Sequence, residues 1–239
     1  MERVQKVISN LGYASRRESE KLIIDGKVLI NDKVAKLGDK VSSKDIIKID
    51  GVVIDKEKAN DKVYYLLNKP RGVVSTVKDE KNRKTVVDLI NTDKRIYPIG
   101  RLDYDTTGVL ILTNDGELTN LLLHPSKEIE KVYLAKIKGI ITGSDIYKLK
   151  QGVMIDNIKT SPARVKLKSF SKKTNTSLVE ITIHEGRNHQ VKKMFQSVGY
   201  DCLKLIRLRF AFLDCKDLKS GEYRELNIKE VKKLYSLGK

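Results

Sequence analysis

The stretch from Gly100 to Asp115, GRLDYDTTGVLILTND, joins an irregular polar segment to an apolar run. Gly100 and Gly108 bracket the polar part, and the run VLILT that follows is typical of a buried strand. Loops at the ends of buried strands are where a rigid scaffold presents reactive side chains. The segment is therefore either a catalytic loop or a turn in which Asp103 and Thr106 bond to the backbone, and spacing alone leaves both open.

The charged residues of this stretch suggest a specific chemistry. Arg101 stands two positions before Asp103 and offers a cation next to a carboxylate, which keeps the acid ionised. An ionised carboxylate in a dry pocket can act as a nucleophile or as a base. Asp103, Asp105 and Asp115 also allow a divalent metal site, but the intervening TTG and apolar strand fit poorly with the oxygen-ligand geometry that such an ion requires.

Composition limits the class of protein. The 239 residues suffice for one large or two small domains with real cores, and 40% hydrophobic with 33% charged residues is typical of a soluble globular chain. Lys and Arg are spread along the whole length and give a net charge of +17. A broad basic surface indicates a polyanionic partner, with nucleic acid as the leading candidate and a merely solubilising surface as the alternative.

Compartment and cofactor signals are few. Cys202 and Cys215 have no Cys or His partner spaced for zinc, so neither a disulfide framework nor a structural metal is expected. The N-terminal MERVQKVISNLG lacks the apolar core of a signal peptide, and no apolar run approaches the ~20 residues of a membrane span. These features predict a cytoplasmic protein without membrane contact, and a monomer is the default expectation.

The first sixty residues predict a small domain of their own. Apolar residues recur at helical spacing from Val4 to Leu11, and Gly12 stands where a C-terminal cap falls. Ser15 with Glu18 is a capping-box signature for a second helix, which Gly26 closes. Short strands follow in KVLIN and DIIKID. The polar segment 54–62 reads as a linker, which places the boundary near residue 60 and gives domains at 1–60 and 61–239.

The second domain alternates strands and short helices without regular strand-helix-strand units, which predicts an α+β fold on a mixed, mainly antiparallel sheet. Strands are expected in 63–68, 108–113, 131–139, 163–170, 177–185, 203–213 and 222–228. Helices are expected in 85–90, in 116–123, after Thr142 and in 188–199.

The N-terminal segment resembles the alpha-L RNA-binding domain shared with ribosomal small-subunit protein four. The resemblance implies RNA contacts from the helical side, by Arg3, Lys6, Ser15, Arg16, Arg17, Lys21 and Lys27. Solvated helix-surface residues are the alternative interpretation of this set. Arg16 and Arg17 lie unfavourably in the first turn of a helix, which suggests a phosphate partner for them.

The remainder of the chain resembles pseudouridine synthases of the RsuA/RluB group, most closely the RluB type that acts on large-subunit ribosomal RNA. The resemblance rests on GRLDYDTTGVLILTNDGEL together with LLNKPRGVVST, EKVYLAKIKG, TSPARV, IHEGRNHQVKKMFQSVGY and LKSGEYREL, in that order, over residues 62–228. Several long motifs in one order are far more specific than one short pattern. One departure is Ala211, where the group often carries Gly, and a methyl group on a strand is usually tolerated.

The resemblance implies roles for single residues. Asp103 matches the catalytic aspartate, Arg101 the arginine beside the flipped nucleotide, and Tyr133 the tyrosine that stacks on the target base. Lys192 matches the basic partner of the aspartate. Further RNA contacts are expected from Arg187, Asn188, Gln190 and Lys193, with loop organisation as an alternative role for Arg187. Adjacent residues of a helix do not share a face, so Lys192 and Lys193 should point differently.

The implied reaction requires neither a metal nor a cofactor. The histidines at 124, 184 and 189 have no spacing for a helical ligand pair, and no catalytic role is assigned to them. Three alternatives stay open: an RsuA-type enzyme of small-subunit RNA, a non-catalytic RNA-binding assembly factor, and a metal-dependent nuclease. The expected partner is ribosomal RNA, either naked or in a pre-ribosomal particle.

Overall fold

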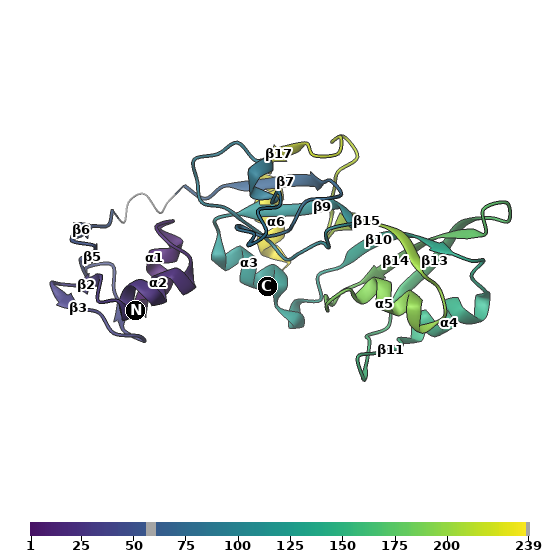
Figure 1. The fold of residues 1–239 in the computed structure, drawn as a ribbon, viewed down its shortest axis with the longest axis horizontal. Coiled ribbons are helices and arrows are strands. Elements are labelled where there is room, and N and C mark those ends of the chain that lie inside the picture. The colour runs from purple at the N-terminus through teal and green to yellow at the C-terminus, as the bar shows by residue number, and fades with distance from the viewer. Residues whose placement is uncertain (56–60, 238–239) are drawn as a thin grey trace. The chain divides into compact units, whose positions relative to one another are not determined.

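The computed structural model describes residues 1–55 and 61–237, which fall into two units (Figure 1). The first comprises Met1–Val63 with Thr92–Arg95 and Asn114–Gly116, and the second contains the rest of the chain. Residues 56–60, which hold the predicted boundary and most of the predicted linker, lie outside the described residues, so that boundary stays a prediction. Ile54 is 3% exposed and belongs to the core of the first unit, so the linker prediction is wrong at its first residue.

The first unit is built on two short helices, α1 (Val4–Asn10) and α2 (Arg16–Ile24). The predicted capping box is confirmed, because Ser15 Oγ accepts from Glu18 N at 3.1 Å and Glu18 accepts from Ser15 N at 2.7 Å. The first turn of α2 thereby gains partners for backbone donors that have none within the helix.

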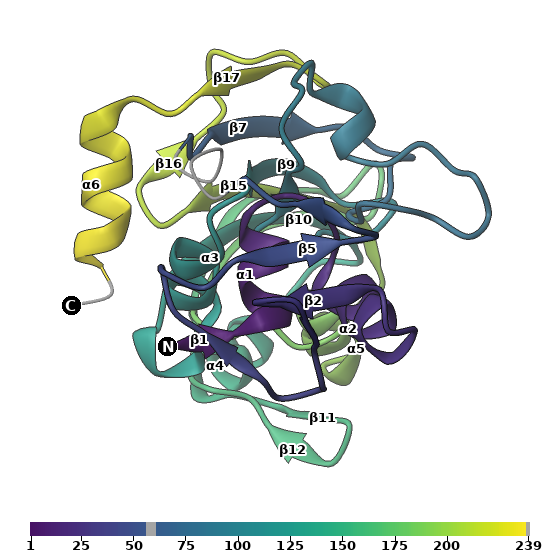
Figure 2. The same cartoon turned by 90° about the vertical axis from the view of Figure 1, so that its left-hand side faces the viewer.

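Short strands complete the first unit. They are β1 (Glu2–Arg3), β2 (Val28–Ile30), β3 (Lys33–Val34), β4 (Lys40–Val41), β5 (Ile47–Ile49) and β6 (Val52–Val53). Four of them form an antiparallel sheet in the order β3-β2-β5-β6, and β1 pairs with β4. The helices cover one face of this sheet (Figure 2), where Val4, Ile8, Ile23, Val28 and Ile47 are buried together. This packing of helices on one face of an antiparallel sheet confirms the predicted N-terminal α+β unit.

The second unit is organised by one large sheet, in the order β13-β14-β10-β15-β9-β7-β17. Its strands are β7 (Tyr64–Lys69), β9 (Thr107–Thr113), β10 (Lys131–Lys138), β13 (Arg164–Ser171), β14 (Thr176–Ile183), β15 (Cys202–Phe210) and β17 (Tyr223–Glu225), with β8 (Tyr97–Pro98) and β16 (Leu213–Asp214) at its margins. All neighbours are antiparallel except β15 and β9. The predicted mixed, mainly antiparallel α+β fold is confirmed.

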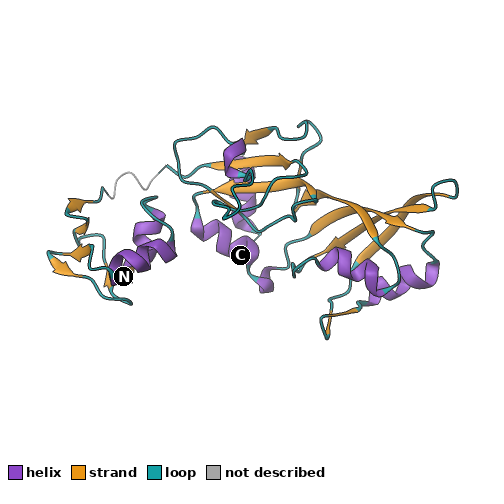
Figure 3. Ribbon diagram, viewed as in Figure 1, coloured by secondary structure: helices purple, strands orange, loops and turns teal. Residues whose placement is uncertain are grey.

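Helices cover the sheet in two groups (Figure 3). They are α3 (Gly116–Leu123), α4 (Gly143–Gln151), α5 (Gln190–Ser197) and α6 (Ile228–Ser236). Leu118 and Leu122 of α3 and Leu234 of α6 join one core with Val109 and Ile111 of β9. The other two lie over the β10–β14–β13 half, where α4 contacts β13 and α5 contacts β15. Thr142 caps α4 by accepting from Asp145 N, as the predicted start after Thr142 requires.

Two predicted elements differ from the structure, and one hairpin lies outside the predictions. Residues 85–90 form only a short 3₁₀ turn, η2 (Val87–Leu89), instead of a helix. The predicted strand 222–228 ends at Glu225, because Asn227 and Glu230 form a capping box that starts α6. A hairpin of β11 (Met154–Ile155) and β12 (Ile158–Lys159) was not predicted, and its turn at Asp156 and Asn157 has positive φ at both positions, as two-residue hairpins favour.

Gly108 in β9 and Ala211 directly after β15 both have positive φ. Gly108 has φ +106°, and a Cβ there would lie 2.2 Å from the carbonyl oxygen of Arg207. Glycine is therefore required for β9 to approach β15 in the parallel pair. Ala211 has φ +52° and lies in the turn after β15, so its expected place on a strand is wrong. Its backbone conformation is one that glycine adopts more readily.

No helix of the described residues is long and apolar enough to cross a membrane.

Candidate active site

The loop between Gly100 and Thr107 carries Asp103, and buried polar side chains hydrogen-bond to its backbone. Ser75, 6% exposed, donates to the carbonyl of Leu102 at 2.8 Å and accepts from its N–H at 3.1 Å. The N–H of Thr106 donates to the carbonyl of Asp103 at 3.1 Å and closes a turn. The backbone on both sides of Asp103 is therefore fixed independently of its carboxylate.

Lys69, at the end of β7, is the main support of this loop. Its side chain is fully buried, and Nζ donates to the carbonyls of Pro70, Asp103 and Thr106 at 3.0, 3.1 and 3.0 Å. Burial lowers the pKa of Lys69 to about 8, although the charges of Asp103 and Asp105 oppose the shift. The ammonium group thus binds two carbonyls of the loop, those of Asp103 and Thr106, and ties them to Pro70, which follows β7.

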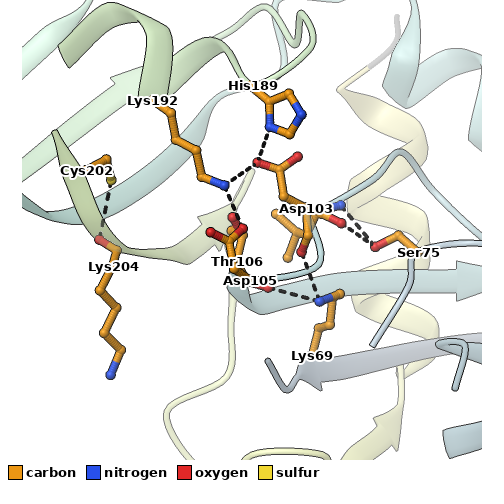
Figure 4. Close-up of polar contacts among 10 residues, drawn as sticks. Lys69, Ser75, Asp103, Asp105, Thr106, His189, Lys192, Cys202 and Lys204 are labelled. Atoms are coloured by element: carbon orange, nitrogen blue, oxygen red, sulfur yellow. Dashed lines mark hydrogen bonds and ion pairs between the residues drawn. The ribbon is translucent and has the colours of Figure 1, made fainter. Parts of the chain in front are cut away.

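The carboxylate of Asp103 meets two side chains from the segment around α5 (Figure 4). Lys192 Nζ lies 2.9 Å from Asp103 Oδ2, and His189 Nδ1 lies 2.9 Å from the same oxygen. Lys192 also donates to Asp105 Oδ1 at 2.6 Å. Asp103 is thus held by two donors, and Lys192 is shared between two carboxylates.

The pKa values of Lys192 and Asp105 are shifted by their contact with each other. Burial alone would lower the pKa of Lys192, but its hydrogen bonds to Asp105 and Asp103 outweigh burial and raise it. The hydrogen bond that Lys192 donates to Asp105 lowers the pKa of Asp105. At neutral pH, Lys192 therefore presents a cation to Asp103.

A pocket of about 430 Å³ opens beside Asp103, and its lining includes Arg101, Asp103, Tyr133, His189 and Arg207. Tyr133, on β10, is 8% exposed. A pocket of this size with a few convergent polar groups has the features of a small-ligand site.

Two buried cations, Lys131 and Arg207, also line the pocket and face the ring of Phe210. Lys131 Nζ and Arg207 Cζ lie 5.8 and 5.3 Å from its centroid. Burial and the neighbouring charge of Arg207 together lower the pKa of Lys131 to about 8. Arg207 Nε donates to the carbonyl of Val109 at 2.7 Å. The pocket wall thus carries positive charge as well as the carboxylate.

The structure brings Asp103, Tyr133 and Arg101 to the lining of one pocket, and Lys192 is tied to that pocket through its ion pair with Asp103. Arg101 is exposed and, among the described residues, makes no hydrogen bond or ion pair. Lys192 lies against Asp103, as the resemblance implied, and His189 lies beside it; Arg101 does not pair with Asp103, and its place beside the flipped nucleotide stays a prediction. The guanidinium group is left free at the pocket wall.

The residues after β14 mostly organise their own loop. Arg187 donates to the carbonyls of Ile158 and Lys159 at 3.2 and 2.9 Å and holds the β11–β12 hairpin. Gln190 is 3% exposed and bonds to Glu185 and to the N–H of Arg187, so the expected RNA contact from its side chain is wrong. Asn188 is exposed.

Lys193 points away from the cluster and pairs with Asp156 at 2.5 Å. Lys192, its neighbour on α5, contacts Asp103 and Asp105 instead. The prediction that the two lysines point differently is confirmed.

In the first unit, most of the predicted RNA contacts are available at the surface. The side chains of Arg3, Arg16, Arg17, Lys21 and Lys27 are exposed. Lys6 pairs with Glu2, and Lys27 lies 3.8 Å from Asp50, in exposed pairs that bind weakly. The hydroxyl of Ser15 is engaged as the cap of α2.

Two residues of the site were missed from the sequence. The spacing of the three histidines is informative only for a metal site. The useful signal is that His189 stands three residues before Lys192, a spacing that places two side chains on nearly the same face of a helix. Lys69 ends an otherwise apolar strand, which gives no sign of a buried cation.

The metal alternative finds little geometric support. Asp115 is 2% exposed and pairs with Lys62 at 3.1 Å, while Asp103 and Asp105 share Lys192. Residues 1–55 and 61–237 contain no cluster of three or more His, Cys, Asp or Glu side chains that could hold a metal ion.

Comparisons with known proteins agree with this geometry. Residues 63–197 match the family of RNA pseudouridylate synthases, and residues 2–47 match the S4 domain. Ribosomal large subunit pseudouridine synthase B of Bacillus subtilis (strain 168) is 51% identical over 99% of this chain and 97% of its own length. The dual-specificity RNA pseudouridine synthase RluF of Escherichia coli (strain K12) is 37% identical over 98% and 79%. A crystal structure of a pseudouridylate synthase superposes with a TM-score of 0.70 at 28% identity, over 98% of this chain and 100% of that one.

Proposed function

This chain belongs to the RNA pseudouridylate synthase family and carries an S4 domain, and from this premise we propose that it converts a uridine of large-subunit ribosomal RNA to pseudouridine through Asp103. The enzyme class, a pseudouridine synthase and hence an isomerase, follows from the family. The RNA target, the role of Asp103 and the independence from metal and cofactor are the proposal. The observation that carries it is the ion pair of Asp103 with Lys192 at the pocket.

The reaction exchanges one bond for another at the same sugar. The bond from C1′ of ribose to N1 of uracil breaks, the base turns, and C1′ joins C5. A proton leaves C5 and N1 gains one, so the product is an isomer and no oxidant or reductant takes part. Asp103 acts on the nucleotide by attacking either the sugar or the base, and both routes require an ionised carboxylate, which here faces the ammonium group of Lys192 at 2.9 Å.

The surrounding residues fit the other requirements. A uridine within folded RNA must be turned out of its stack to reach a pocket. Tyr133 forms an aromatic wall beside Asp103 on which the base stacks, and the exposed Arg101 contacts the extruded nucleotide or its neighbours. A bound nucleotide fills the pocket and excludes water from the carboxylate.

RNA docking is assigned to the basic surface, including the exposed arginines and lysines of the first unit. Contacts to phosphates release counterions, so the affinity for RNA should fall steeply as salt rises. An affinity that does not respond to salt would refute this electrostatic docking.

The choice of large-subunit RNA rests on the Bacillus subtilis relative, whose name states that substrate. Small-subunit RNA is the close alternative within the same reaction, and a pre-ribosomal particle is the alternative form of the substrate. No metal or cofactor is assigned a step.

The test is an isotope-release assay. Purified protein is incubated with a chelator and with large- or small-subunit transcripts that carry tritium at C5 of uracil. Release from the large-subunit RNA alone supports the proposal. Release from the small-subunit RNA alone would show that small-subunit RNA is the substrate. Activity that requires added metal would overturn the assignment of a metal-free reaction. Tight binding to both RNAs without release, also from partly assembled particles, would contradict a catalytic role.

A further inference from the structure

The two oxygens of the Asp103 carboxylate have different surroundings. Lys192 and His189 both approach Oδ2 at 2.9 Å, whereas among the described residues no side chain donates to Oδ1. We propose that His189 is a positioning residue that, together with Lys192, fixes the carboxylate by Oδ2 and leaves Oδ1 as the oxygen that acts on the nucleotide. This inference rests on the proposed function of Asp103.

Lys192 alone does not define the rotation of the carboxylate. An ammonium group on a flexible stem is a point charge that tolerates many orientations of its partner. Lys192 is also shared, and its contact with Asp105 Oδ1 at 2.6 Å is shorter than its contact with Asp103. The planar imidazole of His189 contacts the same oxygen, Oδ2, as Lys192 does (Figure 4). It supplies a second constraint on the rotation of the carboxylate.

The backbone at His189 supports a role beyond local folding. His189 precedes α5 at its N-cap position with φ 52° and ψ 26°, a left-handed conformation that is strained for a residue with a Cβ. Its side chain does not cap the helix. Asn, Asp or Gly would suit such a position better. The contact with Asp103 is what the histidine provides.

The contact requires a proton on Nδ1, because the carboxylate accepts and cannot donate. The neutral Nδ1–H tautomer meets this requirement, so the role is that of a hydrogen-bond donor and needs no charge. The groups that face the imidazole here are Asp103 and, through that carboxylate, Lys192 and Asp105.

Two variants separate positioning from folding. His189→Gly removes the donor and suits the left-handed backbone, so the folded protein should be at least as stable as the wild type. His189→Asn keeps a donor at a similar distance from the backbone and also tolerates that conformation. The donor accounts for about a tenfold to hundredfold difference in rate, the range for a hydrogen bond to a charged group.

The first experiment measures single-turnover tritium release, RNA affinity and urea stability for both variants. We expect His189→Gly to lose about tenfold to hundredfold in rate without loss of affinity or stability, and His189→Asn to recover most of the rate. A glycine variant as fast as the wild type, or a rate that follows stability rather than the donor, would overturn the proposal.

A second experiment is independent of the substrate. Nitrogen-15 spectra of the imidazole report which ring nitrogen carries the proton. We expect Nδ1–H in the wild type and loss of that preference in Asp103→Ala. An Nε2–H tautomer in the wild type would contradict the contact even if no RNA tested is a substrate, while inactivity of the wild type on every RNA would count against the proposed function alone.

Discussion

Replacing Lys69 by Met tests the buried support of the catalytic loop. Lys69 donates to three carbonyls, and hydrogen bonds to a charged group contribute about 1.5–3 kcal/mol each, or roughly 4–9 kcal/mol together. The free-energy cost of burying the cation offsets part of this stabilisation. The pKa falls from 10.5 to about 8, and each pKa unit is about 1.4 kcal/mol, so the cost is about 3 kcal/mol. Lys69→Met should therefore lower the free energy of unfolding by roughly 1–6 kcal/mol at pH 7.

The difference between the two proteins should also depend on pH. The pKa of Lys69 is lower in the folded state, so between pH 8 and pH 10.5 the unfolded chain binds more protons. The stability of the wild type therefore rises with pH in this window, whereas methionine does not titrate. From pH 8 to pH 9 the gap between wild type and variant should widen by about 1 kcal/mol.

Urea unfolding of both proteins at pH 7, 8 and 9 measures these quantities. Lys138→Met is the matched control, since Lys138 is exposed on β10 and its loss should change stability by less than about 0.5 kcal/mol. A Lys69→Met protein as stable as the wild type, or a gap that narrows as pH rises, would refute the assignment of Lys69 as a buried donor to the loop.

Three further substitutions test the fold around the site. Gly108→Ala forces a Cβ to 2.2 Å from the carbonyl of Arg207 and should lower the free energy of unfolding by more than about 4 kcal/mol; a thermal melt close to that of the wild type would contradict the close approach of β9 and β15. Ala211→Gly relieves a positive φ but removes a methyl group that packs against the core, so the two effects oppose each other and the free energy of unfolding in urea should change by less than about 1 kcal/mol, with unchanged activity; a larger gain or loss would show that one of the two effects dominates. Arg187→Ala frees the carbonyls of Ile158 and Lys159, so amide exchange should quicken in the β11–β12 hairpin while global stability changes little; unchanged exchange would mean that the hairpin is held by other contacts.

The features that the sequence predicts well are those encoded by neighbours in the chain. The capping box of Ser15 and Glu18 and the apolar run after Gly108 each specify local structure within a few residues. Helix α6 had the same kind of signal in Asn227 and Glu230. The predicted strand 222–228 runs across that signal, because Leu226 and Ile228 continue the apolar pattern of the strand past Asn227.

The features that could not be read from the sequence depend on residues brought together by the sheet. His189 and Asp103 are 86 positions apart, and only the fold shows that they touch. Spacing alone offers Arg101, two residues from Asp103, as a cation for the acid; only the family resemblance points to Lys192, which lies on α5 and contacts Asp103 in the structure. Lys69 is the last residue of β7 and is fully buried, whereas a lysine at the end of a strand is ordinarily expected to be exposed.

The most direct test of the central claim is the single-turnover rate of Asp103→Asn together with its affinity for the same RNA. The amide keeps the size of the side chain and, with Lys69 and Ser75 holding the backbone, should leave fold and affinity nearly unchanged. The account predicts no tritium release from RNA that the wild type modifies. Modification that continues in this variant would contradict the assignment of Asp103 as the group that acts on the nucleotide.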